Sequence, residues 1–88
     1  MKVEFKSSFA RDLKRIRGKI LKDQIKEVIE QVEQAQGLDQ IVNIKKLAGS
    51  DNYYRIKLAN YRIGLILKDD SIIFVRFLHR KDIYRYFP

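Results

Sequence analysis

Residues 53–64 hold the feature that most constrains the fold: two short stretches of alternating apolar and polar side chains, separated by Ala59-Asn60. Alternation with a period of two residues predicts a β-hairpin with one buried face. The opposite face carries Arg55, Lys57 and Arg62 and no anion. Because like charges held close together destabilise a sheet, we infer that this face binds something anionic. The apolar face comprises Tyr54, Ile56, Leu58, Tyr61, Ile63 and Leu65.

The 88 residues show no internal change in composition, so we expect a single domain over residues 1–88. The chain has no Cys, which excludes a disulfide framework and a thiolate metal site and suits a reducing cytoplasm. The first residues lack the apolar run of a signal peptide, and no stretch reaches the ~20 apolar residues of a membrane helix. We therefore expect a cytoplasmic protein with no membrane among its partners.

The net charge of +8 is unevenly distributed. Residues 1–42 hold nine Lys/Arg and seven Asp/Glu, a net of +2, whereas residues 43–88 hold ten and four, a net of +6. Most of the excess therefore lies in the half that contains the hairpin. Nucleic acid, an anionic membrane surface and an acidic protein are the usual partners of such a charge.

Before the hairpin, the sequence predicts one strand and two helices. Apolar residues alternate with charged ones over 2–6, which indicates a short strand. The pair Ser7-Ser8 offers N-caps for a helix that ends near Gly18. A second amphipathic helix is expected over 19–35, with Gly37 as its C-cap.

The remaining segments predict strands over 41–47, 53–58, 61–67 and 72–78, followed by a final helical turn or two within 79–88. This order predicts an α+β fold: an N-terminal strand, an α-helical hairpin, then a four-stranded antiparallel meander with a short C-terminal helical tail. The helical hairpin should pack on one face of the sheet. The other face should stay uncovered and display the three cations of the β-hairpin.

Several motifs in this order resemble the RelE/ParE toxins of toxin–antitoxin modules. The motifs are Lys46-Leu47-Ala48-Gly49, Tyr54-Arg55-Ile56-Lys57-Leu58, Tyr61-Arg62-Ile63 and His79-Arg80-Lys81-Asp82-Ile83-Tyr84. The resemblance covers essentially the whole chain and is closer to the RelE-type mRNA interferases. It implies a RelE-like type II toxin that inhibits translation as a ribosome-dependent endoribonuclease, cleaving mRNA in the A site. ParE-type members share the fold and poison DNA gyrase instead, so the site must decide between the two.

Cleavage of RNA without a metal needs a base for the ribose 2′-OH, positive charge for the pentavalent phosphate and an acid for the leaving 5′-oxygen. A lysine clustered with other cations gives up its proton more readily than an isolated one. The resemblance matches Arg55 and Lys57 to a lysine pair of the best-known RelE enzyme, and Arg62 to its phosphate-binding arginine. Since Arg is a poor proton acceptor, Lys57 is the candidate general base and Arg55 a stabiliser of charge.

The resemblance also extends to the tail. Arg80 approximately matches a second arginine of that enzyme, and Tyr84 matches a tyrosine that stacks on or positions the nucleotide. The link from the last strand to Tyr84 is two residues shorter here, so Lys81 or His79 are alternatives for the role of Arg80. His79 is the only His of the chain, and a lone His beside a sheet is more often structural than catalytic.

Further cations and one aromatic residue in the basic half are candidates for RNA binding. They are Lys45, Lys46, Arg76, Lys81, Arg85 and Tyr86. No His/Cys/Asp/Glu cluster has ligand spacing, so we expect no metal and no cofactor. The resemblance implies three partners, namely the ribosome, mRNA and a cognate antitoxin that is acidic or partly disordered. A ParE-like gyrase inhibitor and a non-catalytic RNA-binding module stay open as alternatives.

Overall fold

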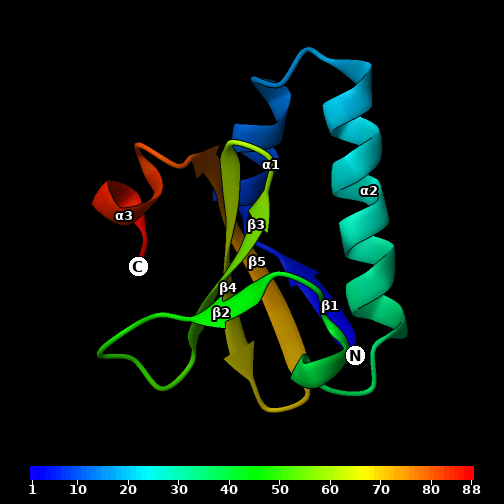
Figure 1. Cartoon of the computed structure of the whole chain (residues 1–88), viewed down its shortest axis with the longest axis vertical. Helices are drawn as coiled ribbons and strands as arrows, with labels where there is room; N and C mark the ends of the chain where they lie inside the picture. The colour runs from blue at the N-terminus through cyan, green and yellow to red at the C-terminus, as the bar shows by residue number, and fades with distance from the viewer.

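The structure is a computed structural model that describes residues 1–88. A five-stranded sheet carries two helices on one side and a short helix on the other (Figure 1). The elements are β1 (Lys2–Phe5), α1 (Ser7–Lys14), α2 (Lys19–Gln34), the 3₁₀ helix η1 (Leu38–Gln40), β2 (Ile44–Lys46), β3 (Tyr53–Leu58), β4 (Tyr61–Lys68), β5 (Ser71–His79) and α3 (Ile83–Tyr86). The predicted α+β fold class is confirmed.

Strand order in the sheet is β1-β5-β4-β3-β2. Strands β2 to β5 form the predicted antiparallel meander. The pairing of β1 was not predicted: it runs parallel to β5, with Lys2 beside Ser71 and Phe5 beside Phe74. The first strand therefore closes the edge of the sheet next to the last one, and the helical hairpin connects it to the opposite edge.

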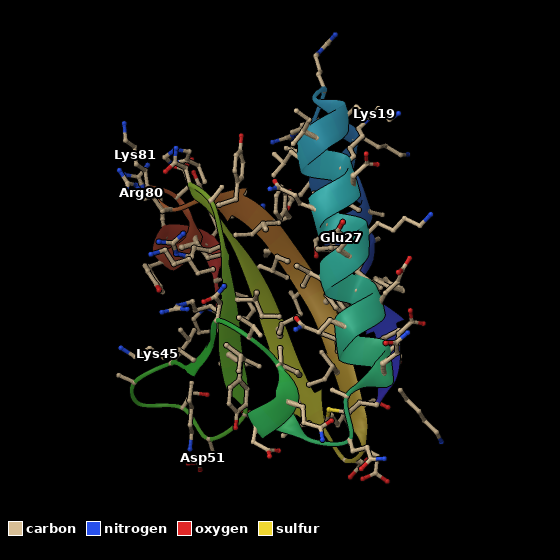
Figure 2. All side chains as sticks on the ribbon, turned by 45° about the vertical axis from the view of Figure 1, so that its right-hand side comes forward. Lys19, Glu27, Lys45, Asp51, Arg80 and Lys81 are labelled. Atoms are coloured by element: carbon tan, nitrogen blue, oxygen red, sulfur yellow. The ribbon has the colours of Figure 1, made fainter.

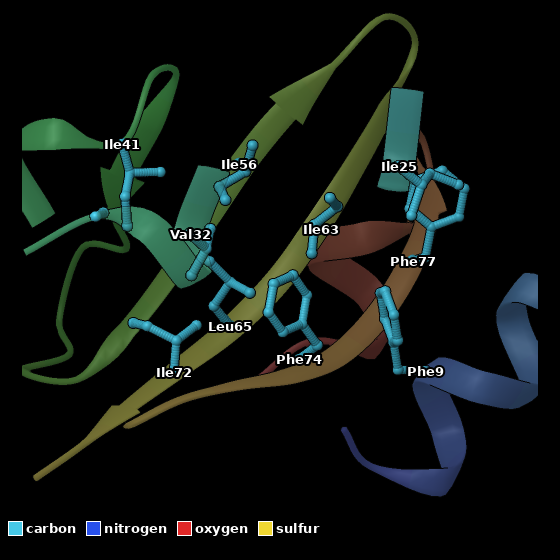
Figure 3. Packing of buried hydrophobic residues seen from close by; sticks show 11 residues of the cluster. Phe9, Ile25, Val32, Ile41, Ile56, Ile63, Leu65, Ile72, Phe74 and Phe77 are labelled. Carbon is cyan, nitrogen blue, oxygen red and sulfur yellow. The ribbon is translucent and has the colours of Figure 1, made fainter. Parts of the chain in front are cut away.

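The core lies between α2 and the sheet face that β3, β4 and β5 turn toward it (Figure 3). The predicted apolar face of the hairpin is confirmed, because Ile56, Ile63 and Leu65 are buried and the rest packs against them. From α2, Ile25 and Val32 enter the same cluster, as the helical periodicity predicts. None of the helices combines the length and the apolar composition needed to cross a membrane.

Where the short strand β1 ends, side chains of helix α1 form hydrogen bonds with the edge of β5. Ser8 Oγ donates to the carbonyl of Val75 at 2.6 Å, and the N–H of Phe77 donates to Asp12 Oδ2 at 2.9 Å. These bonds satisfy backbone groups that a longer β1 would pair. The prediction that Ser7-Ser8 caps the helix is wrong, because both serines lie inside α1 and no side chain caps Lys6.

Three further boundaries differ from the prediction. Helix α1 ends at Lys14 instead of near Gly18. The C-cap of α2 is Ala35, and Gly37 has an extended φ of −165° instead of a left-handed one. The strand expected over 41–47 shortens to β2, because η1 occupies the preceding residues and Asn43 has a positive φ of 64°. The chain therefore makes a sharp bend just before β2.

The face opposite α1 and α2, called the outer face below, is only partly open. Phe87 and Ile83 of the tail are 3% and 0% exposed. A Cβ built on Gly64 of β4 would lie 2.8 Å from the ring of Phe87. Glycine at this position thus lets an aromatic ring lie directly on the backbone. The expectation of an uncovered outer face is wrong over β4 and β5, and correct near β2 and β3.

Candidate functional site

Four cations face one another on the outer face of β2, β3 and β4. Lys45 is paired with Arg55, and Lys57 is paired with Arg62. Directly opposed side chains on antiparallel strands have Cβ atoms only about 4.5–5.5 Å apart. None of the four takes part in an ion pair. We call this arrangement the cation ladder; it concentrates uncompensated positive charge, as the sequence predicts.

Asn43 holds Arg55 and Lys57 of the cation ladder in place, a role that the sequence analysis did not predict. Its carbonyl accepts a hydrogen bond from Arg55 Nη1 at 2.8 Å and another from the N–H of Lys57 at 3.1 Å. The positive φ of Asn43 turns this carbonyl toward β3, and Asn is among the residues that adopt this conformation most readily. An Asn before a basic strand was the available signal.

The turn of the β3–β4 hairpin brings Arg62 and Arg80 to the same end of the sheet. Arg62 Nη1 donates to the carbonyls of Tyr61 at 2.8 Å and Ala59 at 3.1 Å. The N–H of Arg80 donates to the carbonyl of Asn60 at 2.8 Å. In Figure 2, Arg80 and Lys81 lie at this end on the side of the molecule away from α2. The turn therefore fixes the position of Arg80, which the sequence left uncertain.

His79 lies on the other face of the sheet. It pairs with Tyr61, its ring meets that of Tyr61 edge-on at 5.5 Å, and Tyr61 stacks on Phe77 of the core at 4.8 Å. Its Nδ1 accepts the N–H of Lys81 at 3.2 Å, which shapes the turn after β5. The structure therefore does not bring His79 together with Lys57 and Arg62.

Arg76, a candidate for RNA binding, is engaged inside the protein. Its Nε and Nη2 donate to Asp12 at 2.8 and 3.2 Å, and Asp12 is only 4% exposed. The hydrogen bond to Asp12 raises the pKa of Arg76 above its ordinary value. Tyr86 of the tail covers the guanidinium, with its ring centroid 5.7 Å from Cζ. Arg76 thus links α1, β5 and the tail.

A groove of about 620 Å³ lies between the loop after β2 and the C-terminal tail. Its walls include Lys45 and Arg55 of the cation ladder and Tyr84 of α3. Tyr84 and Tyr86 are 60% and 53% exposed, so both rings are accessible. We call this hollow the loop–tail groove.

The other predicted residues are dispersed around the cation ladder. Lys46 lines the loop–tail groove and its Nζ lies 3.8 Å from Asp51. Lys81 and Arg85 are exposed. No three His, Cys, Asp or Glu side chains are grouped so that they could hold a metal ion.

The fold of this chain is shared with a known class of small toxins. The sequence profile of the ParE toxin of type II toxin–antitoxin systems matches residues 3–84. The chain is 49% identical to Toxin RelE3 of Methanocaldococcus jannaschii, and the alignment covers 100% of both. It is 33% identical to the putative toxin RelE1 of the same organism, over 91% of this chain and 89% of that protein. The chain therefore belongs to the RelE/ParE superfamily of type II toxins.

Solved structures agree with this assignment. The structure superposes on a chain of the RelB–RelE antitoxin–toxin complex from Methanococcus jannaschii with a TM-score of 0.81 and 45% identity, covering 97% of this chain and 99% of that one. It also matches the isolated E. coli RelE toxin with a TM-score of 0.64 at 17% identity, covering 89% of this chain and 82% of that one. The second likeness concerns the fold alone.

Proposed function

We propose that this toxin is a ribosome-dependent endoribonuclease that cleaves mRNA in the A site without a metal. The observation that carries the proposal is the cation ladder, in which Lys45 opposes Arg55 and Lys57 opposes Arg62 with no anion between them. A face that keeps four uncompensated cations together is suited to a polyanion. The relationship to RelE toxins supports RNA as that polyanion.

Each side chain of the site has one role in the proposed reaction. Lys57, in its neutral form, accepts the proton of the 2′-OH, and the bond from O2′ to phosphorus forms. Arg62 and Arg55 stabilise the charge of the pentavalent phosphate, for which a guanidinium is suited because it donates two hydrogen bonds in one plane. The bond from phosphorus to O5′ breaks, and Arg80 at the same end of the sheet stabilises the departing oxygen until a water molecule protonates it. Lys57 then returns the proton that it took from the 2′-OH to the solvent. The products are a 2′,3′-cyclic phosphate and a free 5′-OH.

The hydrogen bonds of the Arg62 guanidinium are compatible with the proposed role in binding the phosphate. In the free toxin, its guanidinium bonds to two carbonyls of the hairpin turn. These bonds occupy one nitrogen, Nη1, and leave the donors of Nη2 and Nε for a phosphate. The turn thus holds the arginine near its working position before RNA arrives.

A cognate antitoxin is the second partner in this proposal. The related Methanococcus jannaschii toxin was solved with RelB bound. A net charge of +8 favours an acidic partner, and an acidic or partly disordered chain would cover the cation ladder by wrapping around the toxin.

The direct test is incubation of the purified toxin with programmed ribosomes and mapping of the mRNA ends. We expect cuts within the A-site codon, a cyclic phosphate at the upstream end and no loss of activity when a Zn²⁺-selective chelator is added at fixed Mg²⁺. Lys57→Ala should slow single-turnover cleavage by about 10²–10⁴-fold, as loss of a general base does. Lys68→Ala, an exposed lysine at the far end of β4, is the matched control and should cleave like wild type. Intact mRNA with active ribosomes would refute the proposal.

A second candidate function has a specific basis, since the matching family profile is that of the ParE toxin. A gyrase supercoiling assay should run in parallel. Inhibition of gyrase without mRNA cleavage would establish the ParE-like function. Ribosome binding with neither effect would leave a non-catalytic RNA-binding module.

A further inference from the structure

The helical hairpin carries a second basic surface, which the proposed reaction does not use. Residues 14–26 hold six Lys/Arg and one Asp, a net of +5, whereas residues 1–42 as a whole have a net of only +2. All six cations are exposed, and none of them takes part in an ion pair. We call them the helical basic patch, which consists of Lys14, Arg15, Arg17, Lys19, Lys22 and Lys26.

The charges of α2 are arranged against the helix dipole. Its first turn contains no acidic residue, and its last turn contains no basic residue. Lys19 and Lys22 lie at the amino end, whose partial positive charge repels cations. Glu30 and Glu33 lie toward the carboxyl end, whose partial negative charge repels anions. The stability of the helix therefore does not account for the lysines at its amino end, whereas an anionic partner would.

The three lysines of α2 form a row along the helix. Lys19, Lys22 and Lys26 are three and four residues apart, a spacing that places side chains on one face. The row is about 10 Å long, because each residue of an α-helix rises about 1.5 Å. A groove of about 530 Å³ is lined by Lys14 of α1 together with Lys22 and Lys26 of α2. Cations of both helices therefore border one concave surface.

The helical basic patch and the cation ladder belong to opposite sides of the sheet. Helices α1 and α2 cover one face (Figure 1), and the cation ladder lies on the outer face. Lys19 and Lys45 mark the two surfaces in Figure 2. Because the sheet and the core separate the two surfaces, one short segment of RNA cannot contact both. A toxin whose cation ladder holds mRNA therefore still presents the helical basic patch to its surroundings.

We propose that the helical basic patch binds a double-helical segment of ribosomal RNA while the cation ladder holds the mRNA. This inference rests on the proposed function, since inside a ribosome the polyanion next to a second surface of the toxin is ribosomal RNA. The row on α2 contacts successive phosphates, of which a nucleic-acid strand presents one per about 3.4 Å of helix axis. Arg15 and Arg17, in the turn between the helices, contact the backbone beside them. Such contacts orient a protein without reading sequence.

The test measures ribosome binding apart from cleavage. Lys19→Gln/Lys22→Gln is compared with Lys2→Gln/Lys68→Gln, which removes the same charge from two exposed positions next to Ser71 at the far end of the sheet. Both variants and wild type are sedimented with ribosomes that carry no mRNA, at several salt concentrations and fixed Mg²⁺.

Loss of two phosphate contacts should lower the slope of log K against log salt concentration by about two, and weaken binding about ten- to fiftyfold at about 0.1 M salt. The control variant should bind within about threefold of wild type, because charges far from the contact are screened.

Kinetics, folding and RNA cutting give further readouts. Lys19→Gln/Lys22→Gln should raise the ribosome concentration needed for half-maximal cleavage and leave the single-turnover rate at saturation within about twofold of wild type. Its melting temperature should equal or exceed that of wild type, because two cations leave the amino end of α2. The chain contains no Cys, so Ile20→Cys, at a position that is 78% exposed beside Lys19, can carry an iron chelate. The chelate should cut ribosomal RNA.

The outcomes separate this inference from the proposed function. Equal affinities and salt slopes for the two double variants refute the contact with ribosomal RNA, and cleavage by the wild type then still supports the proposed function. Absence of cuts in ribosomal RNA from position 20 also refutes the contact. Weaker polyglutamate binding by Lys19→Gln/Lys22→Gln at unchanged ribosome affinity would indicate an acidic protein partner and refute it too.

Weaker ribosome binding by Lys19→Gln/Lys22→Gln alone supports the inference, even where the bound toxin leaves mRNA intact, a result that refutes only the nuclease proposal. A wild-type toxin that does not bind ribosomes refutes both.

Discussion

Replacement of Gly64 tests how the C-terminal tail is held on the sheet. A Cβ at this position would lie 2.8–2.9 Å from three carbons of the Phe87 ring, and contacts that short force a neighbour to move. The ring has no free end that could swing away, so the tail must shift with it. Gly64→Ala should therefore destabilise the fold by about 1–3 kcal/mol, the range for inserting a methyl group into a packed site.

The sign of the effect should reverse once the ring is gone. Phe87→Ala alone removes a ring that is 3% exposed and should cost about 3 kcal/mol. In that background a methyl group at position 64 has room, and the backbone of Gly64 is not left-handed. Gly64→Ala should then stabilise the protein by about 0.4–1 kcal/mol, because alanine lowers the entropy of the unfolded chain. The coupling between the two substitutions is thus about 1.5–4 kcal/mol.

Urea unfolding of wild type, both single variants and the double variant, followed by far-ultraviolet circular dichroism, measures this cycle. Ribosomal cleavage should fall in Gly64→Ala as well, because Tyr84 is carried by the same tail. If Gly64→Ala changes the free energy of unfolding by the same amount with and without the ring of Phe87, the ring is not what excludes a side chain at position 64.

Substitutions at four other sites test separate parts of the structure. Arg62→Ala should leave the free energy of unfolding within ~0.5 kcal/mol of wild type, as surface changes do, yet slow single-turnover cleavage about 10²–10³-fold. An equal fall in ribosome affinity would make Arg62 a binding residue instead. Asp12→Ala should cost about 3–5 kcal/mol in urea unfolding, because it leaves the charge of Arg76 without its partner, and an added Arg76→Met should restore part of that loss; a neutral Asp12→Ala would contradict the role given to the pair. Asn43→Gly, which keeps the left-handed bend, should cleave at a near-normal rate, whereas Asn43→Val should lower kcat more than it raises KM. Equal kinetics for the two variants would show that the Asn43 carbonyl does not position Arg55 and Lys57. His79→Gln should retain wild-type cleavage, because His79 lies on the face opposite Lys57; a loss of more than about tenfold would return it to the catalytic set.

Local periodicity was sufficient to predict the elements and the two faces of the central hairpin. Side chains on a strand alternate between faces whatever the strand pairs with, so the burial of Ile56 and Ile63 follows from the sequence alone. The same rule placed Arg55, Lys57 and Arg62 together on the outer face. The existence of both helices follows from their apolar stripes, although the first ends at Lys14 and not near Gly18 as predicted.

Pairings between distant segments were decided only by the tertiary structure. Asp12 and Arg76 are 64 residues apart, and nothing in either local sequence identifies the other as its partner. The parallel pairing of β1 with β5 likewise joins distant segments. It places α1 beside the unpaired edge of β5, where Asp12 accepts a hydrogen bond from the N–H of Phe77.

For the catalytic candidates near the C-terminus, too, the sequence supplied the residue types and the tertiary structure decided their positions. His79, Arg80 and Lys81 are adjacent in sequence, so composition alone treats them as interchangeable. The register of β5 against β4 directs the side chain of His79 to the helix side of the sheet, and the hairpin turn anchors the backbone of Arg80 at Asn60. Sequence therefore determined which residue types were available for an anion site. Packing determined which of them meet, because strand register and the docking of Phe87 on Gly64 depend on contacts between segments that no local pattern encodes.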